Sequence, residues 1–197
     1  MMTAVQTDYI SVFLQAIEMT VALSNKESEA VRSVSTLHFY KKNDMIIRQG
    51  NRFDNEVFVL EGIVRGYYDT YNSKEVNVEF FQGPTVTAPW FTRTFNQYSS
   101  INYQALTPTV TLEIHAENFE ALMKNSAAIN KWATGITQAE LMRKTQREIL
   151  LLTKNAEERF AVFRQMFTSL ENHIALSHIA SYLGITQVSL SRLRSKK

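Results

Sequence analysis

The sequence predicts an α+β protein with an antiparallel β-roll, of the double-stranded β-helix or jelly-roll type, and flanking helices. Between residues 37 and 115, short segments rich in Val, Ile, Phe and Tyr alternate with turn residues. Residues 127–153 contain no proline and only Gly135 disfavours a helix, so a long helix should follow the roll. Residues 176–194 divide at Gly184 into two short helical runs, which is typical of a helix-turn-helix.

Composition narrows the functional classes. The chain has 197 residues, a net charge of +2 and 45% hydrophobic residues, which suits two small domains, or one domain with an accessory element. It contains no cysteine, which excludes disulfides, thiolate-bound zinc, cysteine-ligated iron–sulfur clusters and a cysteine nucleophile. No run of 18 apolar residues and no signal-peptide pattern occurs, so we expect a cytoplasmic protein without membrane contact.

The N-terminal region predicts two helices that cover the roll. One carries an apolar face from Tyr9 to Thr20, and Ser24 with Glu27 forms a capping box that opens the second. Residues 67–78 resemble a hairpin centred on Asn72-Ser73. The expected strands are 37–40, 45–48, 56–60, 63–70, 75–81, 99–105 and 110–115.

The long helix has an apolar seam. Its members follow 3-4-3 spacing, which is typical of a coiled coil, and Met142 and Ile149 continue it loosely. A helix of ~25 residues spans about 37 Å. It could pack on its own β-domain, but we prefer a symmetric dimer helix because the seam is narrow and the other faces are polar. The seam residues are Ile129, Trp132, Ile136 and Ala139.

A second capping box, Asn155 to Glu158, marks a domain boundary. We therefore expect a sensor domain in residues 1–124, a dimerisation helix in 125–154 and a helix-turn-helix domain in 155–197.

The final stretch is the strongest functional signal. Leu190 and Leu193 would hold the second helix to the domain, while Gln187, Ser189 and Arg192 would point outward. No acidic residue occurs from residue 173 to 197, and this basic end favours a phosphate backbone. An ordinary helical hairpin with a solvated basic tail is the alternative.

Several strings resemble the Crp/Fnr family of bacterial transcription regulators. Arg48-Gln-Gly50 and residues 57–65 are similar to the entry of its cyclic-nucleotide-binding β-roll. Ala156-Glu-Glu-Arg159, residues 178–186 and residues 189–192 are similar to its DNA-binding domain. The resemblance implies a homodimer whose sensor domain sets the angle of two recognition helices, and a winged-helix-like C-terminal domain. Because three residues follow Arg194, we expect no strand hairpin after the recognition helix.

The effector region departs from the cyclic-AMP-binding members of this family. Thr87-Ala88 replaces a Gly-Glu pair that binds ribose, and Ser99-Ser100 replaces an Arg-Ser pair that binds phosphate. We predict that the chain does not bind cyclic AMP in the standard way, which leaves another effector or a purely structural pocket. Three aromatic residues here are expected to be core or dimer contacts rather than a ligand cavity, and Arg93 a surface charge. The aromatic residues are Trp90, Phe91 and Phe95.

No cofactor is expected. The four histidines lack ligand spacing, and Glu113 with His115 provides only two potential metal ligands on one strand. The sequence contains no paired nucleophile and base, so a β-barrel enzyme is disfavoured.

The side chains of the predicted recognition helix suit different parts of a DNA duplex. Arg192 suits bidentate contact with guanine, and Gln187 suits adenine or phosphate. Val188 stands where many family members have an acidic residue, and it could contact only a thymine methyl group. The remaining candidates are expected at the DNA backbone, where they fix register. They are Ser177, Thr186, Arg194, Lys196 and Lys197, while Ser189 is a further DNA-binding candidate on the outward face.

Together these features predict a dimeric regulator that binds a two-fold symmetric operator in double-stranded DNA. RNA polymerase and a small-molecule effector other than cyclic AMP are further partners that the resemblance allows. The alternative is a ligand-binding β-roll module whose C-terminal helices mediate protein–protein contacts.

Overall fold

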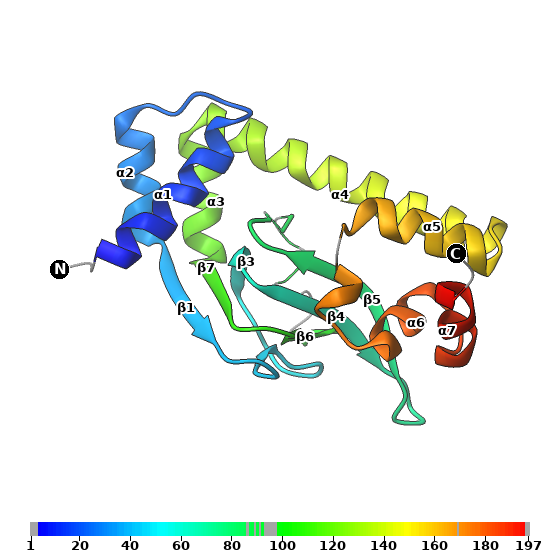
Figure 1. The fold of residues 1–197 in the computed structure, drawn as a ribbon. Helices are drawn as coiled ribbons and strands as arrows, with labels where there is room; N and C mark the ends of the chain where they lie inside the picture. Colours follow the sequence, from blue (N-terminus) through cyan, green and yellow to red (C-terminus); the bar gives the residue numbers. More distant parts are fainter. Residues whose placement is uncertain are drawn as a thin grey trace.

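The computed structural model describes residues 4–85, 87–88, 90, 92, 98–168 and 170–195. Its centre is a roll of two antiparallel sheets, one ordered β1-β7-β3 and the other β2-β6-β4-β5 (Figure 1). This confirms the predicted fold class. The strands are β1 (Thr36–Tyr40), β2 (Met45–Ile47), β3 (Asn55–Glu61), β4 (Ile63–Asp69), β5 (Glu75–Gln82), β6 (Asn102–Ala105) and β7 (Thr109–His115).

The hairpin between β4 and β5 forms where the sequence predicts it. The Thr70 amide donates to the Lys74 carbonyl at 3.0 Å, and Ser73 adopts a positive φ of 55° that closes the turn. The hairpin projects beyond the roll and reaches the C-terminal helices (Figure 1).

Three helices cover one end of the roll: α1 (Ala4–Glu18), α2 (Asn25–Val34) and α3 (Ala116–Asn125). Ser24 and Glu27 form the predicted capping box of α2. Glu27 also accepts from the Ser126 hydroxyl, and this bond, with the Ser24 bonds, lowers the pKa of Glu27 to about 2. These contacts attach α2 to the N-terminus of α4 (Ala127–Thr153), the helix that follows α3.

The long helix α4 has the predicted bounds, Ala127–Thr153. The predicted dimer seam along this helix, however, is wrong for Ile129 and Trp132. Ile129 and Trp132 are 1% and 3% exposed because they pack into the protomer's own core, where Trp132 meets Phe13, Phe58 and Phe119. No surface of these two side chains remains for a partner. Ile136 packs against the same core, and Ala139 is exposed.

The C-terminal part consists of α5 (Ala156–Met166), the short 3-10 helix η1 (Leu170–Asn172), α6 (Leu176–Leu183) and α7 (Gln187–Ser195). Among its described residues no strand occurs. These helices pack on β5 and the end of α4 (Figure 1). Their core includes Ile63, Phe80 and Leu106 of the roll, so the roll completes it. None of the described helices is both long and apolar enough to cross a lipid bilayer.

Candidate nucleic-acid interface

The turn between α6 and α7 depends on Gly184. Its φ is 68°, a left-handed conformation that glycine adopts without steric cost. The amides of Gly184 and Ile185 donate to the carbonyls of Ser181 and Ala180 at 3.1 and 3.0 Å, which closes α6. Thr186 then caps α7, because its hydroxyl accepts from the Ser189 amide at 3.1 Å. The predicted helix-turn-helix geometry therefore follows from local contacts.

The second helix of this motif has one anchored face and one exposed face. Leu190 is completely buried and Leu193 packs against the same core. Gln187 and Arg192 are exposed, and Val188 is 61% exposed although it is apolar. Val188 and Arg192 lie four residues apart, so they share one face of α7.

The other residues predicted to contact DNA differ in how available their side chains are. Ser177 and Thr186 are exposed, whereas the half-buried Ser189 hydroxyl shares a 2.8 Å hydrogen bond with that of Thr186. Arg194 lies 3.5 Å from the Glu171 carboxylate, which also contacts Arg164. Lys196 and Lys197 lie outside the described residues. The ion pair between Arg194 and Glu171 could not be predicted from the composition of residues 173–197, because Glu171 lies just outside this stretch without acidic residues.

The helix-turn-helix is attached to the roll by a buried arginine. Arg65 on β4 is 4% exposed, and its Nη1 lies 2.5 Å from Glu75 and 3.1 Å from His178 Nδ1 on α6. Arg65 donates to this nitrogen only if His178 is neutral. Burial, and then the charge of Arg65, lower the pKa of His178 below its usual value, while Glu75 opposes them.

Further polar contacts extend this attachment. The Asn77 amide on β5 donates to the Ser181 hydroxyl at 2.9 Å. Arg147 on α4 donates to the carbonyls of Asn77 and Tyr182 at 3.4 and 3.1 Å and stacks on the Tyr182 ring. Three segments that are distant in sequence are thereby joined.

A groove separates the β4–β5 hairpin from the start of α7. It has a volume of about 530 Å³, and Lys74, Glu75 and Val76 form one wall. Ser177, Thr186 and Gln187 lie on the opposite wall. Three of the residues predicted to contact DNA therefore face the hairpin across open space.

The predicted effector residues do not form one open site. Thr87 and Ala88 are 2% and 3% exposed, and Thr87 borders an interior space of about 10 Å³, room for one water at most. Ser99 is 9% exposed, and its hydroxyl and backbone bind Ile101 and the Gly50-Asn51 turn. Ser100 is exposed.

The aromatic residues predicted for this region are only partly described. The half-buried Trp90 donates its amide to Glu56 at 2.8 Å. Phe91, Arg93 and Phe95 lie outside the described residues.

The Glu113 position is structural. Its carboxylate accepts from Tyr40 and Asn55, each at 2.9 Å, and lies 3.9 Å from His38 Nε2. Within the described part of the chain, no group of three histidine or acidic side chains could hold a metal ion.

Comparison with known proteins agrees with this geometry. Residues 37–126 match the family model of the cyclic nucleotide-binding domain. Among curated protein sequences, none matches this chain.

Solved structures match over most of the chain. FixK2 from Bradyrhizobium japonicum has a TM-score of 0.72 and 20% identity, covering 83% of this chain and 84% of its own. The c-di-GMP-responsive global regulator CLP from Xanthomonas campestris has a TM-score of 0.69 and 14% identity, covering 88% and 91%. A Eubacterium rectale protein assigned to the Crp/Fnr family of transcriptional regulators has a TM-score of 0.65 and 19% identity, covering 87% and 82%. The chain thus has the fold of these regulators, and the match to the cyclic nucleotide-binding domain model falls on residues 37–126, which hold the roll and α3.

Proposed function

We propose that this protein is a DNA-binding transcription regulator that binds a two-fold symmetric operator as a homodimer, without the standard contacts to cyclic AMP. The main support is the face of α7 on which Val188 and Arg192 are exposed while Leu190 is buried. A helix held from behind and solvated in front can enter the major groove. Arg192 has no ion-pair partner among the described residues, so its guanidinium is available for a guanine.

A dimer would use the exposed side of α4. Gly135, Gln138, Met142, Thr145, Ile149 and Leu152 are all exposed and follow alternating spacings of three and four residues. We call this row the α4 strip. Its first residues are displaced by one position from the predicted seam, and its apolar members include Ile149 and Leu152, which are 54% and 79% exposed.

The operator contacts can be tested by fluorescence anisotropy on genomic fragments retained by the purified protein. Arg192→Ala should weaken operator binding by about 1–3 kcal/mol and relax specificity at one base pair. The matched control is Arg52→Ala, which removes the same charge from an exposed loop residue of the roll. If no duplex binds in a salt-sensitive manner, the regulator proposal fails and the protein-contact alternative is favoured.

A further inference from the structure

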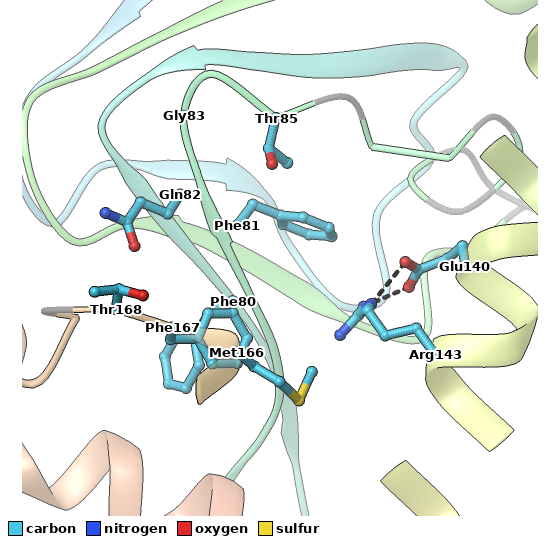
Figure 2. Close-up of a pocket in the computed structure, with 10 residues that line it drawn as sticks. All are labelled: Phe80, Phe81, Gln82, Gly83, Thr85, Glu140, Arg143, Met166, Phe167 and Thr168. Atoms are coloured by element: carbon cyan, nitrogen blue, oxygen red, sulfur yellow. Dashed lines mark hydrogen bonds and ion pairs between the residues drawn. The ribbon is translucent and has the colours of Figure 1, made fainter. Parts of the chain in front are cut away.

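A cleft lies where the roll meets α4 and α5. It has a volume of about 470 Å³ and lies between the end of β5, the middle of α4 and the end of α5 (Figure 2). Cavities of this size accept small organic ligands. The interior space of the roll that Thr87 borders has, by contrast, a volume of about 10 Å³.

One side of the cleft is apolar. Phe80 and Phe81 are buried at its floor, and Phe167 stands edge-on to Phe80 with 6.0 Å between the ring centroids. Met166 is 43% exposed although it is apolar and borders the opening. This wall suits a ring or a branched aliphatic group.

The opposite side carries a guanidinium. Arg143 donates from Nε to Glu140 at 2.8 Å and from Nη2 to the other Glu140 oxygen, and Nη2 lies 3.6 Å from the buried Glu79. Among the described residues, none accepts a hydrogen bond from Arg143 Nη1, which points away from Glu140 (Figure 2). Two carboxylates, Arg143 and Lys144 form a neutral group, so an added anion meets no net negative charge.

We propose that this cleft binds a small amphipathic carboxylate, with its acid group on Arg143 and its apolar body against Phe167 and Met166. The hydroxyls of Thr85 and Thr168 and the Gln82 amide line the same space and add donors for the acid. Binding there stands on this geometry alone. Its role as an effector site rests on the proposed function: the ligand would touch α4, β5 and α5 together and so favour the attached arrangement of the helix-turn-helix.

The first experiment measures binding to the full chain without DNA. Phenylacetate and indole-3-acetate are titrated to millimolar concentration against protein labelled at its methionine methyl groups. The Met166 resonance should shift saturably while that of Met45, on β2, stays in place. Phenylacetamide, which lacks the charge, should bind about tenfold more weakly. No shift at Met166, or equal binding of the amide, overturns the site.

Variants separate the two walls. Arg143→Gln should weaken phenylacetate binding about tenfold, and the matched Arg52→Gln should leave it unchanged. Met166→Trp fills the cleft from a partly exposed position, so it should fold and lose the rise in Tm that phenylacetate produces. A rise retained in Met166→Trp contradicts the proposal.

A DNA measurement then tests the effector role. The affinity for duplex should change in the presence of phenylacetate for the native chain and not for Met166→Trp. Ligand binding without such a change retains the site and rejects its regulatory role, whereas a chain that binds the acid but no DNA contradicts only the proposed function.

Discussion

The two halves of α4 differ in what they contact. The first half packs through Ile129, Trp132 and Ala133 into the apolar core beneath α1 and α3. The second half contacts the rest of the chain through charged groups: Lys144 binds the buried Glu79 at 2.6 Å, and Arg147 reaches β5 and α6. Its outer side carries Met142, Thr145, Ile149 and Leu152 of the exposed α4 strip. The start of α4 is therefore part of the apolar core. Its second half binds the roll and α6 through Lys144 and Arg147, and we call these charged contacts the polar joint.

The apolar half should be the most sensitive to truncation. Trp132→Ala would leave a cavity among three phenylalanine rings and cost about 3–5 kcal/mol in the free energy of unfolding. Urea denaturation measures this loss. Tyr71→Ala removes an aromatic ring that is 97% exposed and should cost less than about 0.5 kcal/mol. Similar losses in both variants would remove the distinction between the halves.

The α4 strip should control assembly rather than folding. The double variant Ile149→Glu/Leu152→Glu places charges where a symmetric dimer would bury apolar groups twice. It should raise the dimer Kd by at least about 100-fold, near 3 kcal/mol, with little effect on unfolding of the monomer. Sedimentation velocity reports the change, and Gln146→Glu adds a charge beside the strip as the control. A dimer that persists in the double variant would assign assembly to another surface.

The polar joint should hold the helix-turn-helix in place. Arg147→Met removes two hydrogen bonds from a charged donor, and about 1.5–3 kcal/mol of local stability should be lost. Faster amide hydrogen exchange in α6, with unchanged exchange in β7, would show this. Arg164→Met breaks an exposed ion pair with Glu171 and should cost below about 1 kcal/mol.

The smallest predicted effect is a pH dependence of the contact between the helix-turn-helix and the roll. His178 has a lowered pKa in the folded chain, so it binds fewer protons there than in the unfolded chain. Its contribution to stability is complete above the unfolded pKa of about 6.5 and decreases as pH falls below that value. The charged groups facing it are Arg65 and Glu75.

Thermal unfolding between about pH 7.5 and pH 5.5 measures this dependence. The decrease in Tm on acidification should be smaller in His178→Gln than in the native chain. His173→Gln replaces an exposed histidine of the same region and should retain the native slope. An identical slope in His178→Gln would show that this proton is not linked to the attachment.

Local patterns explain why much of the fold could be predicted. The capping boxes at Ser24 and Asn155 and the turn at Asn72-Ser73 each act within a few residues, and the structure confirms all three. The exposed face of α7 likewise follows from spacing within one turn. Apolar periodicity in α4, however, does not distinguish a partner helix from the protein's own core. Ile129 and Trp132 were misassigned for this reason.

Long-range contacts could not be predicted from such patterns. Arg65 and His178 are separated by 113 positions, and the Glu79–Lys144 pair by 65, so no spacing rule connects them. The spacing around Arg143 in α4 likewise gives no sign of a cleft, because the other walls of that cleft come from β5 and α5. The DNA contacts inferred from the sequence also remain predictions. They concern Ser177, Thr186, Gln187, Val188, Ser189, Arg192, Arg194 and Lys196.

The shared core of the C-terminal helices also bears on how the chain is made. The Phe80 ring packs against Phe163 and Tyr182, and Leu106 and Leu170 belong to the same core. Phe80 and Leu106 are part of the roll, which is synthesised before the C-terminal helices. Synthesis proceeds from the N-terminus, and earlier parts generally fold first. We therefore expect the C-terminal helices to fold last, against a roll that has already formed.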